Sequence, residues 1–386
     1  MNSLRIAMVA AEPSGDLLAA GLMARLRELY PNASFEGVGG PQMLALGFDS
    51  WEPMETLSVM GLVEVLRDLP RLLGLRRTLI RRWLDSPPDV FIGVDAPDFN
   101  LVIETRLRAA SVPTVHYVSP TVWAWRQKRV RKIKAAVDLL LSIFPFEQKF
   151  LQNHGVPSEY VGHKLAADMP LQPDRDEARN KLGLDPAAPV LALLPGSRAG
   201  EVGKLTVPFL QTAERCIEQI PDLLIVVPLV NQKTRELFRQ VKMQLAPQLS
   251  CLEVMGDTRN VMAAADVILT ASGTATLEGL LSKRPMVVGY KLNSLTYWIA
   301  RLFKLVKIKH IAMANLLADE RLAPEFIQQE CEPEYLVPAV LEMFSNEEKV
   351  NVIKQRYCEI HQQLTIDSDQ VAADAISRLL QERGIV

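Results

Sequence analysis

One strand and the turn after it set the pattern for the chain: Val90-Phe91-Ile92-Gly93-Val94-Asp95-Ala96-Pro97-Asp98-Phe99-Asn100. Its first five residues are an unbroken apolar run, which is typical of a strand covered on both faces of a parallel sheet. Ligands of open α/β sheets bind beyond the carboxyl ends of such strands. Asp95, directly after the strand, is therefore a candidate for chemistry. The alternative is that Asp95 or Asp98 merely caps the next helix, a role that suits Asp98 well.

Length and composition indicate a globular protein of about two domains. The chain has 386 residues, which is too many for one ordinary core. Its net charge of −2 argues against general nucleic-acid binding, which requires a strongly basic domain. The four cysteines are widely spaced without a CxxC pair, as expected of reduced thiols in a cytoplasmic protein. We find no signal peptide and no apolar run that approaches the ~18 residues needed to span a bilayer.

Strands and helices alternate along the chain, which predicts parallel sheets. We expect strands at 5–11, 35–39, 90–94, 114–118, 139–143 and 158–161, and again at 190–194, 223–227, 250–254, 267–270 and 286–290. The proline-containing segment 168–174 between the two sets reads as a linker. The fold class is therefore α/β, with two Rossmann-like domains that face a cleft containing the active site. The expected domains are 1–170 and 171–355, followed by helices at 356–386 that pack across the domains or onto a partner subunit.

Two turns of the second domain have the composition of an anion site. The first is Leu194-Pro195-Gly196-Ser197-Arg198, and the second is Ser272-Gly273-Thr274, followed by Glu278. Each leads from a strand into a helix, whose free backbone amides attract phosphate. Arg198 adds a planar cationic group suited to phosphate oxygens, and Glu278 can accept hydrogen bonds from a ribose diol. Either turn alone could be a simple helix cap, but the two together predict a site for a nucleotide diphosphate.

Other sequence features bear on a dinucleotide, a metal and a membrane. No GxGxxG follows the first strand, which disfavours a nicotinamide dehydrogenase. The Asp-x-Asp pairs at 174–176 and 367–369 read as helix starts, and the five histidines lack ligand spacing, so we expect no metal and no cofactor.

The segment 59–84 mixes leucines and valines with six arginines, a pattern typical of a helix lying on an anionic membrane surface. The alternative is a core helix with a solvated basic face. A second basic run, at 126–134, follows two tryptophans. It could bind phosphorylated lipid, or it could be an ordinary solvated helix face.

Several stretches together resemble the bacterial lipid-A-disaccharide synthase family. They are Ala11-Glu12-Pro13-Ser14-Gly15-Asp16, the 93–100 turn, the 116–126 run with its Trp-Ala-Trp-Arg, the two anion turns and Pro285-Met286-Val287-Val288-Gly289-Tyr290. A minor departure is Pro13, where threonine is familiar. The resemblance implies a glycosyltransferase B fold and attachment to the cytoplasmic face of the inner membrane.

The resemblance also implies a reaction. UDP-2,3-diacylglucosamine would transfer its sugar to 2,3-diacylglucosamine 1-phosphate (lipid X), giving a β-1,6-linked disaccharide phosphate and UDP, with inversion. Asp95 would be the catalytic base, and Glu12 a reserve base or an orienting group. Arg198 would stabilise the departing diphosphate. Asn315 would contact the donor, although it could equally be a helix cap.

Both substrates carry acyl chains, which gives the apolar residues of segment 59–84 a function at a membrane. We expect a membrane contact made by Val63, Leu66, Leu69, Leu72 and Leu73. A second contact patch would comprise Tyr297, Trp298, Leu302 and Phe303.

The alternative function is a UDP-N-acetylglucosamine 2-epimerase-like enzyme on the same fold. Such an enzyme would act on a soluble sugar, so it gives no reason for the arginine–leucine segment. A non-catalytic lipid-binding protein would leave the two anion turns unexplained. A homodimer through the C-terminal helices is a further possibility.

Overall fold

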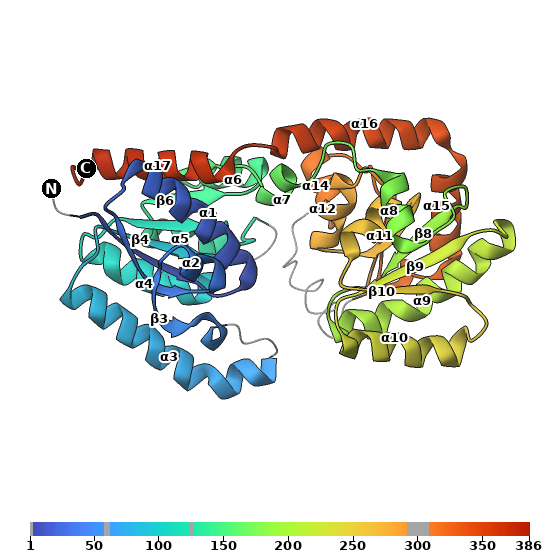
Figure 1. Cartoon of the computed structure of the whole chain (residues 1–386), viewed down its shortest axis with the longest axis horizontal. Helices are drawn as coiled ribbons and strands as arrows, with labels where there is room; N and C mark the ends of the chain where they lie inside the picture. The colour runs from blue at the N-terminus through green and yellow to red at the C-terminus, as the bar shows by residue number, and fades with distance from the viewer. Residues whose placement is uncertain (1–2, 58–61, 124–126, 292–308) are drawn as a thin grey trace. The chain divides into compact units, whose positions relative to one another are not determined.

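The computed structural model describes residues 3–57, 62–123, 127–291 and 309–386, with only the backbone given for 62–68. The chain forms two compact units, Met1–Ala167 with Leu364–Val386 and Asp168–Gln363 (Figure 1). Each unit is built on a parallel sheet, so the predicted α/β class with two parallel sheets is confirmed. No helix among the described residues has the length and apolar character that crossing a bilayer would require.

The first unit contains a seven-stranded sheet in the order β3-β2-β1-β4-β5-β6-β7. The strands are β1 (Arg5–Ala10), β2 (Ser34–Gly39), β3 (Asp49–Pro53), β4 (Val90–Val94), β5 (Thr114–Tyr117), β6 (Leu139–Ser142) and β7 (Ser158–Tyr160). The helices are α1 (Pro13–Leu29), α2 (Pro41–Ala45), α3 (Leu62–Asp85), α4 (Pro97–Ala109), α5 (Val130–Ala136), α6 (Pro145–Asn153) and α17 (Ser368–Glu382), and α7 (Lys164–Asp168) lies where the units join. Two 3-10 turns, Met54–Thr56 and Gln127–Arg129, precede α3 and α5.

Both faces of this sheet are covered because side chains alternate along each strand. On β1, Ile6 and Met8 belong to a core shared with α1 and α17, whereas Ala7 and Val9 pack in the core formed with α3 and α4. This two-sided burial explains why the central strands read as continuous apolar runs rather than as alternating ones. In Figure 1, α17 lies beside α1, and α3 lies on the other side of the sheet.

The second unit contains a six-stranded sheet in the order β10-β9-β8-β11-β12-β13. The strands are β8 (Val190–Leu194), β9 (Leu224–Leu229), β10 (Leu252–Met255), β11 (Val267–Ala271), β12 (Met286–Tyr290) and β13 (Glu325–Ile327). The helices are α8 (Arg175–Leu182), α9 (Ala199–Gln219), α10 (Gln232–Leu245), α11 (Thr258–Ala264), α12 (Thr274–Leu281), α14 (Met313–Ala318), α15 (Pro333–Ser345) and α16 (Glu347–Leu364), with a 3-10 turn at Gln328–Glu330.

Each sheet has one point at which the strand order reverses. In the first unit it lies between β1 and β4, and in the second between β8 and β11. At such a switch point the two following loops leave in opposite directions and open a crevice where ligands bind. The loop after β1 carries Glu12 and the loop after β4 carries Asp95, while the two anion turns follow β8 and β11. The candidate catalytic carboxylates and the two anion turns therefore lie at the switch points.

The last helix packs within its own chain. The apolar face of α17 is buried in the core of the first unit, through residues such as Ala372, Ile376 and Leu380. Polar bonds fix it there, including Lys164 to Asp369 at 3.0 Å and Tyr30 Oη to Ser377 Oγ at 2.7 Å. The units divide at 167/168 and 363/364, whereas the sequence suggested 170/171 and 355/356, because α16 packs with the second unit and only α17 returns to the first.

Candidate functional site

The turn after β4 holds Asp95 in an uncommon backbone conformation. Asp95 and Ala96 have φ angles of 53° and 43°, so two consecutive non-glycine residues are left-handed. The Asp95 amide donates to the Tyr117 carbonyl at 2.8 Å, which ties the turn to β5. Glu12, the N-cap residue of α1, is exposed, and its side chain makes no cap hydrogen bond. Because Ala10 and Val94 are paired in the sheet, Glu12 and Asp95 follow neighbouring strand ends.

The Asn100 side chain holds this turn in place through hydrogen bonds to backbone carbonyls. Its side chain is fully buried, and Nδ2 donates to the carbonyls of Asp95 at 2.8 Å, Val9 at 3.3 Å and Val94 at 3.4 Å. One amide therefore ties the ends of β1 and β4 together. Gly93 allows this approach, because a Cβ there would lie 2.8 Å from the Asn100 Cβ. The sequence pattern contained Asn100 but gave no indication of this function.

A buried pair lies under the same turn. Glu104 Oε1 and His116 Nδ1 are 2.6 Å apart, and both side chains are completely buried. Burial raises the pKa of Glu104, and the nearby His116 opposes that shift. Glu104 also approaches the backbone of β4, since a Cβ on Gly93 would lie 2.2 Å from its Oε1. Sequence reasoning missed this pair because its members belong to α4 and β5.

Asp98 does not cap α4. The N-cap residue is Ala96, without a side-chain cap hydrogen bond, and Asp98 lies in the first turn. Its carboxylate is 87% exposed and forms an ion pair with Arg129. Asp98 therefore links α4 to the basic segment that follows β5.

The two turns of the second unit line one cavity of about 300 Å³. Its lining includes six of the residues predicted to bind the UDP group: Ser197, Arg198, Ser272, Gly273, Thr274 and Glu278. Gly196 and Gly273 have φ angles of 121° and 130°, which non-glycine residues rarely adopt. Each turn therefore depends on a glycine.

Glu201 is a member of this cavity that the sequence reading did not identify. Its Oε2 accepts from the amides of Ser197 at 3.2 Å and Arg198 at 3.4 Å, and its Oε1 lies 3.6 Å from Arg198 Nη1. The backbone amides at the start of α9 thus donate hydrogen bonds to a carboxylate of the protein itself. The Arg198 side chain is 84% exposed, and its one ion pair is with Glu201 in the described residues. Burial raises the pKa of Glu278 in the same cavity, and Arg259 opposes the shift.

Asn315 is not among the residues lining this cavity. It is fully buried, and its amide donates to the Ala323 carbonyl at 2.7 Å and to Glu325 Oε1 at 2.8 Å. Glu325 in turn accepts from the amides of Ile311 and Ala312. The Ile311 carbonyl accepts a 2.9 Å hydrogen bond from Ser272 Oγ. Asn315 is therefore connected to the second anion turn through the 311–313 loop, and its own polar atoms are occupied within the protein.

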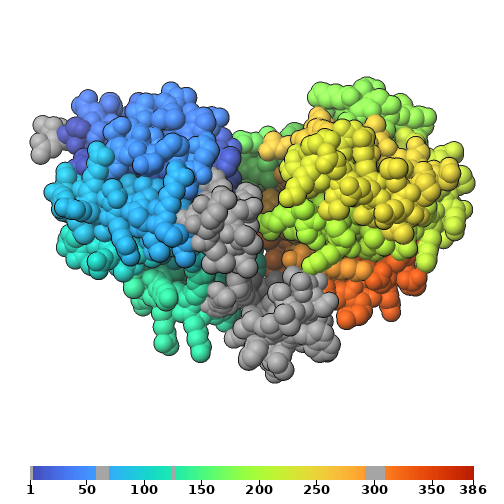
Figure 2. All heavy atoms as spheres, turned by 90° about the horizontal axis from the view of Figure 1, so that it is seen from below, coloured from blue at the N-terminus to red at the C-terminus, as the bar shows by residue number. Residues whose placement is uncertain are grey.

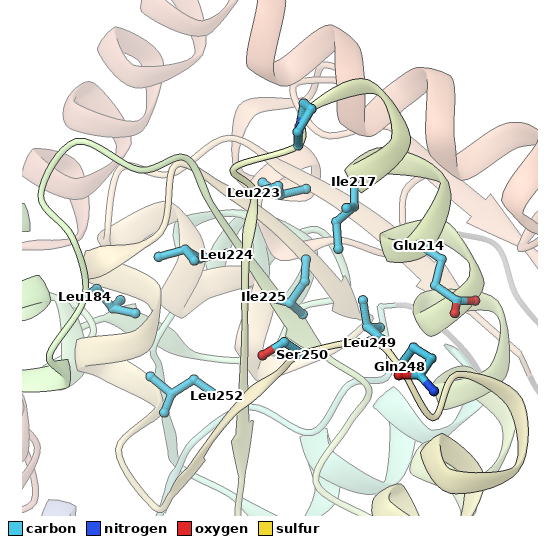
Figure 3. Close-up of a pocket in the computed structure, with 11 residues that line it drawn as sticks. Leu184, Glu214, Ile217, Leu223, Leu224, Ile225, Gln248, Leu249, Ser250 and Leu252 are labelled. Atoms are coloured by element: carbon cyan, nitrogen blue, oxygen red, sulfur yellow. The ribbon is translucent and has the colours of Figure 1, made fainter.

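A larger cavity, of about 460 Å³, lies elsewhere in the second unit (Figure 3). Leucine and isoleucine side chains from the amino ends of β9 and β10 and from the end of α9 point into it. Of the described residues that line it, only Glu214 is charged. This cavity is at the wrong edge of a parallel sheet for a ligand site.

The Asp-x-Asp pairs are helix starts. Asp174 caps α8 by accepting from the Glu177 amide, and Asp367 caps α17 by accepting from the Gln370 amide. Across the described residues, no group of three or more histidine, cysteine or acidic side chains is arranged to hold a metal ion.

Helix α3 combines a buried half with a more open half. Leu79 and Trp83 are buried against the sheet, so the alternative of a core helix holds for this part. Leu69 is 40% exposed, and Leu72 and Leu73 are half-buried. Seen from below, α3 faces the viewer (Figure 2). The side chains of Val63 and Leu66 lie outside the described residues, as does the whole second patch of Tyr297, Trp298, Leu302 and Phe303.

A protein-family model described as lipid-A-disaccharide synthetase matches residues 6–378 of the chain. The lipid-A-disaccharide synthase of Aeromonas hydrophila is 50% identical over 379 residues, which cover 98% of this chain and 99% of that one. The same-named protein of Pseudoalteromonas translucida is 48% identical, with 98% of each chain covered.

Solved structures with the same fold are much more distant in sequence. An S. aureus MnaA–UDP co-structure has a TM-score of 0.64 at 13% identity and covers 100% of this chain and 98% of that one. The calicheamicin glycosyltransferase CalG4 has a TM-score of 0.60 at 15% identity, with 99% of each chain covered. These similarities establish a glycosyltransferase B-like fold.

Proposed function

The chain belongs to the lipid-A-disaccharide synthase family, and on that basis we propose which of its residues carry out the reaction. It is a glycosyltransferase of lipid A biosynthesis that condenses UDP-diacylglucosamine with lipid X. The epimerase alternative is set aside, because the solved UDP-N-acetylglucosamine 2-epimerases are only 11–13% identical to the chain, which shows a shared fold alone.

Asp95 is the proposed catalytic base. Transfer to a hydroxyl requires a group that removes the hydroxyl proton in the transition state. The observation that carries this proposal is the position of Asp95 at the switch point of the first sheet, directly after a fully buried strand. Asn100 and Tyr117 hold its backbone in place, which favours a fixed direction for the carboxylate. Glu12, at the neighbouring strand end, is the reserve base or an orienting group.

The cavity of about 300 Å³ that the two anion turns line is the proposed site for the UDP diphosphate. The amides at the start of α9 and the small residues Ser272, Gly273 and Thr274 would surround the phosphates. Arg198 would swing onto them and stabilise the charge that develops as UDP departs. We propose that the incoming diphosphate displaces the Glu201 carboxylate from the Ser197 and Arg198 amides. Glu278 would accept hydrogen bonds from the ribose.

We propose that Asn315 supports the donor site through the 311–313 loop. Its hydrogen bonds to Ala323 and Glu325 leave it no free polar atom in this structure. A direct contact with the donor would require these bonds to be exchanged.

Peripheral attachment to the cytoplasmic face of the inner membrane is proposed through Leu69, Leu72 and Leu73, together with Val63 and Leu66. Substrates with acyl chains would be taken from that surface. A homodimer through the C-terminal helices would have to use surfaces other than the apolar face of α17, which the first unit already covers. We further propose that the two compact units are the acceptor domain and the donor domain.

The experiment is to measure UDP release and disaccharide formation with UDP-2,3-diacylglucosamine, with and without lipid X, in the presence and absence of EDTA. We expect release that depends on lipid X, that is accompanied by a β-1,6 disaccharide phosphate, and that EDTA leaves unchanged. Release of UDP without acceptor would contradict the proposal, as would an α-linked product.

A further inference from the structure

Two arginines from different elements meet at the first turn of α4, three residues after Asp95. Arg76, from α3, donates from Nη1 to the Asp98 carbonyl at 3.1 Å. Arg129, from the segment after β5, forms an ion pair with the Asp98 carboxylate. The proposed mechanism of donor activation and proton removal uses neither of them. We define Arg76 and Arg129 as the arginine pair.

Among the described residues, Arg76 has no carboxylate as a counterion. It is half-buried, and its guanidinium lies over the Phe99 ring, 5.9 Å from the centroid. In the part of the chain that the structure describes, no carboxylate lies within ion-pair distance of it. Burial lowers the pKa of Arg76, and the neighbouring charge of Arg77 lowers it further. A partly desolvated cation of this kind is stabilised when an anion binds beside it.

Arg129 is held by a partner that a ligand could replace. Its side chain is only 28% exposed, but the Asp98 carboxylate that pairs with it is 87% exposed. An exposed ion pair contributes little to stability, about 0–1 kcal/mol. A phosphate dianion, with more charge and three acceptor oxygens, would therefore compete well for the Arg129 guanidinium.

The reaction requires such a site. Donor and acceptor both contain a diacylglucosamine, so the enzyme must tell them apart at the anomeric carbon. There the acceptor carries a phosphomonoester, whereas the donor carries a diphosphate joined to uridine. The acceptor hydroxyl has to reach Asp95 while the phosphate remains at the other end of the sugar ring. Asp98 follows Asp95 by three residues, and three residues of chain span at most ~10 Å.

We propose that the arginine pair binds the phosphomonoester of the acceptor and thereby selects the phosphorylated sugar for the acceptor side. The inference rests on the proposed function, because it assumes that the acceptor hydroxyl lies at Asp95. Arg76 supplies the uncompensated charge, and Arg129 exchanges Asp98 for the phosphate.

The test compares lipid X with its dephosphorylated counterpart, 2,3-diacylglucosamine, as acceptors in micelles of a neutral detergent. For Arg76→Ala and Arg129→Ala we expect the acceptor KM to rise at least tenfold, with the donor KM unchanged. Selectivity for the phosphorylated acceptor, measured as the ratio of kcat/KM values, should fall at least tenfold in each variant. Arg76→Gln, which keeps a polar side chain of similar length, guards against a loss of folding and should give the same loss of selectivity.

Arg81→Ala is the matched control. Arg81 lies on the same helix, but it is 86% exposed and already pairs with Asp85, so its removal should leave acceptor selectivity unchanged. Anionic lipid headgroups are the other source of phosphate that the arginine pair could contact. Binding to vesicles with and without anionic lipid separates the two sources, because a headgroup site would weaken vesicle binding while micellar selectivity stays intact.

Weaker vesicle binding of the arginine variants with unchanged selectivity in micelles would overturn the inference. An equal loss of selectivity in Arg81→Ala would also overturn it. The proposed function is judged separately. If the wild-type protein forms no disaccharide, the function itself fails. If it does form disaccharide but Arg76→Ala, Arg76→Gln and Arg129→Ala all retain full selectivity, only the inference fails.

Discussion

At the scale of single residues, the turn after β4 stores strain that its neighbours offset. Left-handed backbone at a non-glycine residue costs of order 1–3 kcal/mol, and Asp95 and Ala96 both adopt it. The hydrogen bonds from the Asn100 amide and to the Tyr117 carbonyl hold the strained segment in place. Strain that surrounding groups maintain in this way is common where a side chain must point in a fixed direction.

Asn100→Ala should therefore lower kcat by about 10- to 100-fold, since a small misplacement of a catalytic group can cost that much. The donor KM should not change, because the diphosphate cavity lies in the other unit. Steady-state kinetics with both substrates measures this effect. In the Asp95→Asn background the same substitution should have little further effect on kcat, because residues that act as a unit are not additive. Fully additive losses would mean that Asn100 acts only on stability.

A second residue-scale prediction concerns Glu147, which is buried near Trp123. Its carboxylate accepts from Trp123 Nε1 at 3.1 Å and from the Phe144 amide at 3.2 Å. Burial raises its pKa from 4.5 to about 8. A raised folded-state pKa means that the folded protein binds a proton that the unfolded chain releases above pH 4.5. This contribution to stability is complete at low pH and is lost as the pH rises from 4.5 to about 8.

Replacing Glu147 with glutamine removes this titration. The difference in unfolding free energy between wild type and Glu147→Gln, measured by urea denaturation, should shift in favour of the variant as the pH rises from 5 to 8, a span of roughly three units that the linkage relation covers. A difference that does not change with pH would contradict the assignment.

At the scale of elements, the prediction from sequence and the structure differ most at α3. Its alternating leucines and arginines were compatible with a membrane helix or with a core helix. The contacts of Leu79 and Trp83 show that the second half is core. Amphipathic periodicity alone could not reveal this, because the same apolar stripe serves a protein core or a lipid surface.

Replacing both Leu69 and Leu72 with glutamine should reduce binding to anionic vesicles by at least about tenfold, because a leucine moved out of water contributes roughly 1.5–3 kcal/mol. Turnover of micellar substrates should change little. Leu84 is a matched control, since it lies on the same helix and is also 40% exposed, as Leu69 is. If Leu84→Gln weakens vesicle binding to the same degree, the contact is not confined to the first half of α3. Co-sedimentation with vesicles measures both variants.

The central strands could be predicted because burial on both faces leaves a continuous apolar run, as in β4, β8 and β11. The edge strands β3 and β13 could not. Their residues are mostly half-buried and include Asp49, Glu52 and Glu325, so no run or alternation marks them. Strand-end residues such as Asp95 and Ser272 were predictable for the same reason as the strands that precede them. Partners such as Glu201 and Asn100 were not, because their function depends on hydrogen bonds rather than on a local pattern.

At the scale of the whole molecule, the chain is two sheets of similar design, each with its candidate residues at its own switch point. Sequence predicted the two parallel sheets, but it could not assign the last helix. The apolar face of α17 suits a domain or a partner subunit equally well, and only the contacts with α1 show that it completes the first unit. The proposed functions divide in the same way, with proton removal in the first unit and diphosphate binding in the second.

Proton removal by Asp95 is tested most directly by the turnover of Asp95→Asn together with its affinity for UDP. We expect kcat to fall by roughly 10²- to 10⁴-fold, the usual contribution of a general base. The dissociation constant for UDP, measured by calorimetry, should remain that of the wild type, because the cavity lined by the two anion turns is intact. If Asp95→Asn turns over within a fewfold of wild type, Asp95 is not the base.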